Sequence, residues 1–231
     1  MTLISHLLSH ATRRAAGLLL ALSATMAHGT AHAQVGMANT ELGGLPVTLI
    51  YPTAEPVKRL VQGSFEIDVA VDAAPTPGPH ALVVMSHGTG GSALTDHALA
   101  ATLARAGFIV AQPQHRGDNH ADMSKSGPAA WTTRPREISA VIDALAASPM
   151  WRPLVQVDKV GVHGMSAGGG TALVMAGARW RVLDLARHCA EHGDEDFGFC
   201  FNGTASPTAR AERRRTSIVP GMRPRPSCRP A

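Results

Sequence analysis

The feature that most restricts the fold of this chain is a serine enclosed by glycines between residues 160 and 169. The segment reads Val-Gly-Val-His-Gly-Met-Ser-Ala-Gly-Gly, with Ser166 at the centre of Gly-x-Ser-x-Gly. An apolar stretch typical of a strand precedes the serine, and small residues typical of a helix follow it. Such a sharp turn needs Gly164 and Gly168, because larger side chains would collide with the strand or the helix. The pattern predicts a strand–turn–helix unit with Ser166 as a candidate nucleophile; the simpler alternative is a tight turn of the kind found in nucleotide-binding folds.

A second glycine-rich turn lies upstream, directly after the apolar run 81–86. It reads Ser-His-Gly-Thr-Gly-Gly over residues 86–91. Serine hydrolases place one oxyanion donor in a turn at this position, and the residue after the nucleophile supplies the other. We therefore expect the backbone N–H groups of Thr89 and Ala167 to form an oxyanion hole, where each donor contributes about 3 to 4 kcal/mol. The alternative is a flexible glycine-rich loop.

Strand-like and helix-like patterns alternate along most of the chain, which favours a mostly parallel sheet flanked by helices. We expect strands at 47–51, 65–71, 81–86, 108–112 and 159–163, and helices at 92–106, from Thr133 to about residue 145, and at 166–178. The helical pattern weakens after Arg179, and no further strand is expected. The last 22 residues, 210–231, are rich in Arg and Pro and are expected to be disordered.

The net charge of +4 is misleading, because many basic residues lie at the two ends of the chain. Between Gln34 and Ala209 there are 12 basic and 16 acidic residues, so this part carries a net charge of −4. A nucleic-acid-binding protein needs a basic face with helical or aromatic readout elements. The sequence shows neither, so we expect no nucleic-acid partner.

The first 33 residues have the composition of an export signal. Arg13 and Arg14 precede an apolar run over 15–27, and Ala31-His32-Ala33 offers small residues at the two positions that a signal peptidase reads. The run is shorter than the roughly 20 residues that a membrane-spanning helix needs. We expect cleavage before Gln34 and an exported, periplasmic or secreted protein, with the Sec and twin-arginine routes both open.

Three cysteines in an exported chain allow one disulfide. Cys189 and Cys200 enclose ten residues, and closing such a loop contributes about 3 kcal/mol on the chain-entropy model. We expect these two cysteines to pair; the alternative is two free buried thiols. Cys228 lies in the Arg/Pro-rich tail and receives no role.

Together these motifs resemble exported α/β-hydrolases known as predicted dienelactone hydrolases, which are related to platelet-activating-factor acetylhydrolases. The resemblance rests on Leu-Ile-Tyr-Pro-Thr at 49–53, the turn at 86–91, Gln-His-Arg-Gly-Asp at 114–118 and the serine segment at 164–169. Such enzymes are cofactor-free serine hydrolases that act on small esters or lactones. True dienelactone hydrolases use cysteine as the nucleophile, so Ser166 favours ester hydrolysis.

The chain departs from this family after Ser166. The family continues for roughly a hundred residues that supply the triad Asp and His, and these have no counterpart here. In this fold the base normally comes from a loop after the last strand. Asp184 and His188 are one helical turn apart and form a weak alternative dyad on the wrong element. A serine without a base is a poor nucleophile. The Arg/Pro-rich composition of the tail suggests an altered reading frame or a truncated product.

The sequence thus predicts a signal peptide at 1–33, the N-terminal part of an α/β-hydrolase domain at 34–209 that lacks the C-terminal strands, and a tail at 210–231. We expect an ester or lactone hydrolase that forms an acyl-enzyme on Ser166, without cofactor or metal. The loop at 115–122 has residue types that could bind a metal, but a polar loop after a strand explains it more simply. The alternatives are a catalytically inactive fragment and an exported module that binds an anionic ligand in the same cleft.

Overall fold

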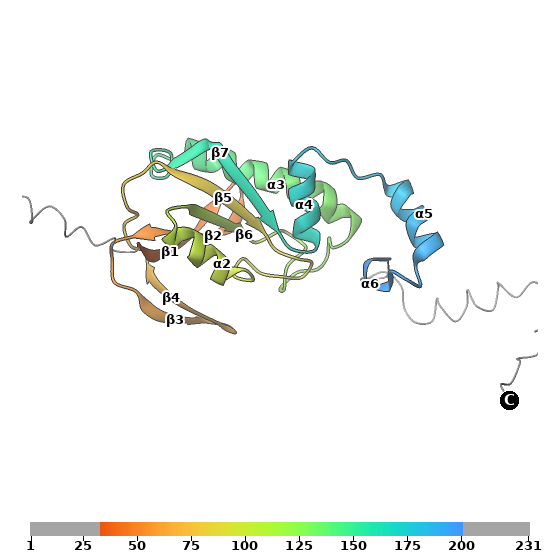
Figure 1. Cartoon of the computed structure of the whole chain (residues 1–231), viewed down its shortest axis with the longest axis horizontal. Helices are drawn as coiled ribbons and strands as arrows, with labels where there is room; N and C mark the ends of the chain where they lie inside the picture. The colour runs from red at the N-terminus through yellow and green to blue at the C-terminus, as the bar shows by residue number, and fades with distance from the viewer. Residues whose placement is uncertain (1–32, 201–231) are drawn as a thin grey trace, which may run out of the picture.

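The computed structural model describes residues 33–200, which form one seven-stranded sheet with helices on both faces (Figure 1). The sheet has the order β3-β4-β1-β2-β6-β5-β7. Its strands are β1 (Gln34–Leu42), β2 (Leu45–Thr53), β3 (Lys58–Gln62), β4 (Phe65–Val71), β5 (His80–Ser86), β6 (Ile109–Pro113) and β7 (Val155–Gly164). The helices are α2 (His97–Arg105), α3 (Pro128–Ala147), α4 (Ala167–Met175), α5 (Val182–His192) and the short α6 (Phe197–Cys200).

The sheet is mixed, and its parallel part holds the candidate site. β5 runs parallel to both β6 and β7, whereas β2 runs antiparallel to β1 and β6. Ser86 at the end of β5 pairs with Gly164 at the end of β7. The carboxyl ends of parallel strands meet at one edge of the sheet, which is where ligands bind in open α/β sheets. The two glycine-rich turns therefore emerge side by side.

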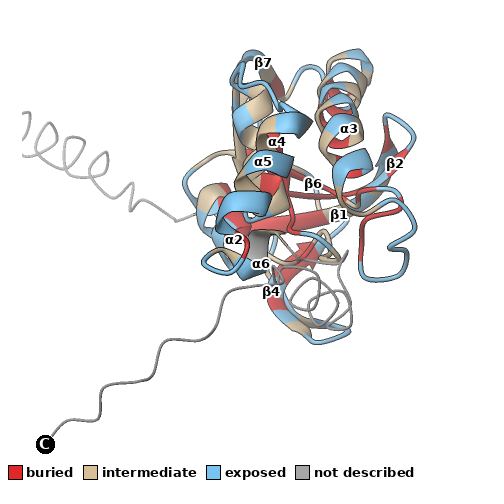
Figure 2. Cartoon of the chain, turned by 90° about the vertical axis from the view of Figure 1, so that its right-hand side faces the viewer, coloured by how far each residue is buried: buried red, intermediate tan, exposed pale blue. Residues whose placement is uncertain are grey.

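The core consists of two apolar layers, one on each face of the sheet. On one face α2 buries Ala100, Ala101 and Ala104 against β1, β2, β5 and β6. On the other face Ile138, Val141 and Leu145 of α3 pack on the same central strands, with α4 alongside. The central strands are buried on both sides, as the red segments in Figure 2 show. Burial on both faces explains why their sequences read as continuous apolar runs.

Several boundaries differ from the sequence-based expectations. The helix expected from Ser92 begins at His97, because 92–96 form turns. The helix expected from Thr133 begins at Pro128, after Gly127, so Pro135 lies inside it rather than in its first turn. Strand β2 continues through Pro52 instead of ending before it.

Two strands, β1 and β3, were not expected from the sequence. Gly43 and Gly44 adopt positive φ angles of 58° and 74° and form the two-residue turn between β1 and β2. Such a Gly-Gly turn is a recognised hairpin pattern, and it is the signal that could have identified β1. Strand β3 is short, pairs only with β4 among the described strands, and is mostly exposed, so it has little hydrophobic alternation to detect.

Helices α5 and α6 project from the body of the molecule at its right-hand end in Figure 1. Helix α5 begins at Val182, in the segment after Arg179 where the helical pattern of the sequence weakens.

Candidate active site

Ser166 occupies a strained position between β7 and α4. Its φ and ψ angles are 53° and −118°, a region that residues with a side chain rarely adopt and that is often found at functional sites. A Cβ atom at Gly164 would lie 2.1 Å from the carbonyl oxygen of Gly168, and one at Gly168 would lie 1.8 Å from the carbonyl oxygen of Ser86. Both glycines are therefore required by the close approach of strand, turn and helix.

The glycine-rich turn after β5 lies directly against this serine. A Cβ atom at Gly88 would lie 3.5 Å from the Cβ atom of Ser166 and 3.6 Å from the carbonyl oxygen of Met165. Ser166 itself is exposed, and it precedes the first residue of α4, where the helix dipole favours negative charge. The structure thus brings the two motifs together at the surface.

The proposed oxyanion donors both lie next to this serine in the structure. Thr89 follows Gly88, and Ala167 is the first residue of α4. Among the described residues neither amide N–H donates a hydrogen bond to another group.

His87 lies behind the turn and is 3% exposed. Its Nε2 accepts a hydrogen bond from the His115 backbone N–H at 3.2 Å, so its Nδ1 carries the proton and donates to the Gly88 carbonyl at 2.7 Å. Burial lowers the pKa of His87 to about 4. The ring is therefore neutral near neutral pH, and it is a structural part of the turn rather than a base for Ser166.

Three side chains beneath the serine turn, those of Ser86, His115 and Glu137, are hydrogen-bonded in the order of a catalytic triad. Nε2 of His115 lies 2.8 Å from Oγ of Ser86, and Nδ1 lies 2.7 Å from Oε2 of Glu137. Ser86 is only 1% exposed and His115 is fully buried, so no substrate reaches either group. Burial also lowers the pKa of His115, opposed by the Glu137 carboxylate. These hydrogen bonds hold the side chain of Ser86 in place. The carbonyl group of Ser86 accepts a hydrogen bond from the Met165 N–H at 3.4 Å.

Sequence reasoning missed a further buried residue at this site, Arg134 on α3. Arg134 and Asp118 are each 1% exposed and form an ion pair of 2.8 Å. Asp118 belongs to the loop at 114–118 that carried part of the family resemblance. One sequence signal could have identified Arg134. It lies four residues from both Ala130 and Ile138, so all three fall on the same buried face of α3.

A cavity of about 640 Å³ borders the glycine-rich turn. Gly90 and Gly91 form part of its wall, together with Phe65, Leu94 and His120. It lies at the same edge of the sheet as the two turns, because Val47 at the start of β2 pairs with Pro113 at the end of β6. Neither Ser166 nor Thr89 is among the described residues that line the cavity.

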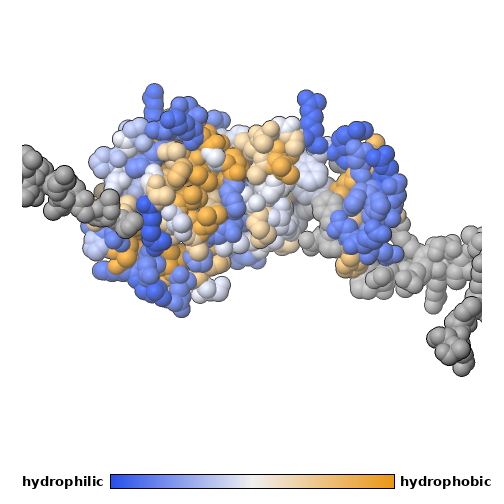
Figure 3. Space-filling model, in the orientation of Figure 1, coloured by the Kyte–Doolittle hydropathy of each residue, from blue (hydrophilic) through white to orange (hydrophobic). Residues whose placement is uncertain are grey.

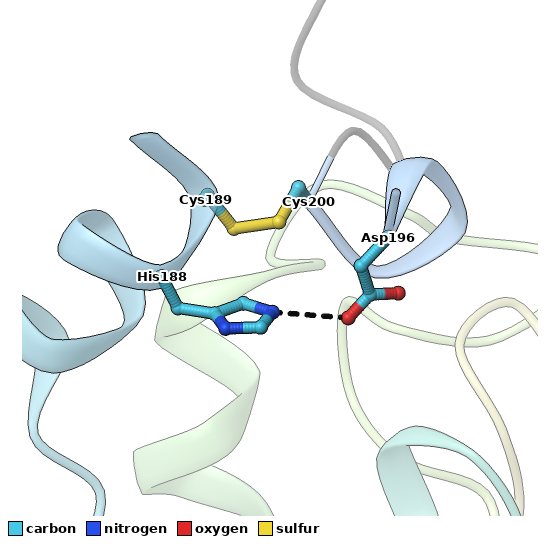
Figure 4. Close-up of a disulfide and its surroundings, with 4 residues drawn as sticks. All are labelled: His188, Cys189, Asp196 and Cys200. Atoms are coloured by element: carbon cyan, nitrogen blue, oxygen red, sulfur yellow. Dashed lines mark hydrogen bonds and ion pairs between the residues drawn. A yellow bond between two sulfur atoms is a disulfide. The ribbon is translucent and has the colours of Figure 1, made fainter. Parts of the chain in front are cut away.

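Asp184 and His188, the weak alternative dyad of the sequence analysis, are not paired with each other in the structure. Asp184 pairs with Arg181 and Arg187, and His188 lies 3.1 Å from Asp196 instead (Figure 4). Among residues 33–200, no base lies within hydrogen-bond distance of the Ser166 hydroxyl. Asp184 and His188 therefore do not act as a base pair for Ser166.

Cys189 of α5 and Cys200 of α6 are bonded to each other, with a Cα–Cα distance of 5.3 Å (Figure 4). The bond lies beside the contact between His188 and Asp196, so two interactions tie the projecting helices together.

Within the described part of the chain, no three potential metal ligands cluster, and no helix has both the length and the apolar composition needed to cross a membrane.

Comparison with known families agrees with this architecture. Residues 30–137 match the family described as platelet-activating factor acetylhydrolase, isoform II. The solved structure of a ferulic acid esterase from Streptomyces cinnamoneus aligns with a TM-score of 0.54 and 24% identity, over 65% of this chain and 57% of the esterase. The chain therefore has an α/β-hydrolase fold. The helix-flanked sheet expected from the sequence is thereby confirmed.

The family match includes the turn at 86–91 and the loop at 114–118 but ends before Ser166. A dienelactone hydrolase from Anabaena variabilis also aligns, with a TM-score of 0.42 and 21% identity over 63% of this chain and 57% of that protein. The chain therefore spans less than two thirds of the length of these two solved structures. No curated protein matches it significantly.

Proposed function

We propose that this α/β-hydrolase cleaves carboxylic esters or lactones through an acyl-enzyme on Ser166. The observation that carries the proposal is the exposed serine in a strained backbone conformation with Gly88 against it. Ser166 Oγ attacks the ester carbonyl carbon, and the carbonyl oxygen becomes an oxyanion that accepts hydrogen bonds from the Thr89 and Ala167 N–H groups. The alcohol then leaves, and water hydrolyses the acyl-enzyme.

This reaction needs a base that takes the proton from Ser166 Oγ and passes it to the leaving alcohol. Because no described residue lies in that position, turnover depends on a base from elsewhere. We therefore expect the rate of acylation to rise when imidazole is added, since imidazole can serve as a diffusible base. The second candidate function, a non-catalytic protein, is favoured by the same missing base.

A fluorophosphonate probe separates the two candidates. The full chain is incubated with the probe, with and without imidazole, and the labelled peptide is identified by mass spectrometry. We expect labelling at Ser166 that imidazole accelerates, and none in Ser166→Ala. Ser139→Ala, which removes an exposed hydroxyl on α3, serves as the control and should label normally. A folded chain that stays unlabelled even with imidazole would favour the non-catalytic protein.

We also propose that residues 1–33 direct export and are removed. Strand β1 begins at Gln34, immediately after the expected cleavage site. A disulfide between Cys189 and Cys200 is expected mainly in oxidising compartments outside the cytosol. The mass of the protein recovered from cell fractions tests this: a periplasmic or secreted product beginning at Gln34 supports export, and an intact N-terminus contradicts it.

A further inference from the structure

The turn that carries Thr89 is held from the inside of the molecule by one buried side chain. Nη1 of Arg134 donates to the His87 carbonyl at 2.5 Å, and Nη2 donates to the Gly88 carbonyl at 3.3 Å. Nη2 also donates to the Asp118 carbonyl at 3.2 Å. One guanidinium thus binds two successive carbonyl groups of the turn after β5 and one of the loop after β6.

These contacts fix the direction of the neighbouring amides. A peptide group is planar and trans, so its N–H points opposite to its C=O. The Gly88 carbonyl receives hydrogen bonds from Arg134, from Nδ1 of His87 and from the Gly91 N–H at 3.0 Å. The N–H of the same peptide belongs to Thr89, so it must point away from Arg134 and out of the turn.

Asp118 holds the guanidinium and the turn together. Its carboxylate pairs with Arg134, and its Oδ1 accepts hydrogen bonds from the Gly90 N–H at 3.3 Å and from the Ser126 hydroxyl at 2.9 Å. A buried guanidinium needs such a partner, because an unpaired buried charge is strongly destabilising. Burial lowers the pKa of Arg134, and the charge of Asp118 opposes that effect.

We propose that Arg134 is a positioning residue for the oxyanion hole: with Asp118, it orients the peptide between Gly88 and Thr89 so that the Thr89 N–H is presented to the oxygen of the substrate at Ser166. The inference rests on the proposed function, since it assigns a role within the same site. This role differs from simple packing because Arg134 binds the carbonyl oxygen of the same peptide group that carries the Thr89 N–H. A role confined to anchoring α3 would need no hydrogen bond to that peptide.

The test uses two variants of the full chain. Arg134→Lys keeps the charge but loses the planar pair of donors, which a compact ammonium cannot replace. Arg134→Met combined with Asp118→Asn removes both charges, which avoids leaving one buried and unpaired. Arg136→Lys, on the exposed side of the same helix, is the matched control. Circular dichroism and thermal unfolding establish that each variant is folded.

The first readout is the rate of labelling of Ser166 by the fluorophosphonate, measured over a range of probe concentrations in the presence of imidazole. Misplacing a reacting group by about 1 Å can lower a rate by about 100-fold. We expect both Arg134 variants to lower the limiting rate by about 10-fold to 100-fold, with little change in the probe concentration that gives half of this rate. The control variant should match the wild type. A folded Arg134 variant with the wild-type limiting rate would overturn the proposal.

The second readout does not depend on any reaction. Residual dipolar couplings report the orientation of the Thr89 N–H bond in solution. We expect the coupling of Thr89 to change in both Arg134 variants while the couplings of β2 and β6 stay the same. If wild-type Ser166 is not labelled at all, the proposed function fails, and the couplings still decide the positioning role. An unchanged Thr89 coupling would refute it.

Discussion

At the scale of single residues, His87 couples the stability of the turn to pH. Its pKa is lowered to about 4, mainly because burial penalises the charged ring. In the unfolded chain the ring takes up a proton near its ordinary pKa of about 6.5. Between those values the unfolded state binds more protons than the folded state, so stability falls as the pH is lowered through this window. The His115 pKa is also lowered by burial and acts in the same direction.

We therefore expect the free energy of unfolding to be about 2 kcal/mol smaller at pH 5 than at pH 7 from His87 alone. Urea unfolding at the two pH values measures it. His87→Gln should be less stable at pH 7 but should show a weaker dependence on pH. His120→Gln, which changes an exposed ring, should keep the wild-type dependence because the buried ring remains. Equal stability of the wild type at both pH values would show that His87 is not buried as described.

Residues of this buried kind were the hardest to predict from the sequence. The sharp turn at Ser166 and the need for its flanking glycines could be predicted from one short segment, because sterics demand those residue types in order. Arg134 and His115 lie 32 and 51 residues away from Ser166 along the chain. Their contacts depend on how α3 and the loop after β6 pack behind β5, and single-sequence patterns do not contain that information.

At the scale of the elements, the junction of β7 with α4 gives a sharp steric prediction. Gly164→Ala would place a methyl group 2.1 Å from backbone atoms of α4, which cannot move aside without shifting the helix. Overpacking of this kind costs about 1 to 3 kcal/mol or more. We expect Gly164→Ala to lower the free energy of unfolding by at least about 2 kcal/mol and to slow the labelling of Ser166. Thermal unfolding and probe labelling together measure these effects.

Gly161→Ala on the same strand is the matched control. The nearest atom to its added methyl group is Cγ2 of Val83 at 3.7 Å, an ordinary contact. This variant should stay within about 0.5 kcal/mol of the wild type, as most unstrained substitutions do. If the two variants were equally stable, the close contact between Gly164 and α4 would be contradicted.

The elements themselves were predictable to different degrees. Strands buried on both faces, such as β5 and β6, have continuous apolar sequences and were placed within one residue. The start of α3 was misplaced because Pro135 usually marks a first turn, whereas here Gly127 and Pro128 begin the helix. Local rules compete at such positions, and the burial of Ala130 and Arg134 in the first turns of α3 favours the earlier start.

At the scale of the whole molecule, β7 is an edge strand of the sheet formed by residues 33–200. Among the described strands it pairs with β5 alone, and Val157 on it is 45% exposed. Figure 3 shows an apolar surface on the face where β5 and β7 lie in Figure 1. An open strand edge with apolar neighbours is a template for pairing with another chain. Asp158 and Lys159 on the same strand oppose this, because charges at an edge disfavour pairing.

We therefore expect this chain to self-associate as its concentration rises, through the β7 edge. Val157→Lys adds a charge to that edge and should shift the association to higher concentration by about 10-fold, as a change of about 1.4 kcal/mol would. Analytical ultracentrifugation over a concentration series measures the shift. Val71→Lys is the matched control, because Val71 is 52% exposed but lies on β4, which has a neighbour on each side. If Val71→Lys weakened association as much as Val157→Lys, general surface charge rather than the β7 edge would be responsible, because β4 lies between β3 and β1 and so is not an edge strand of the described sheet.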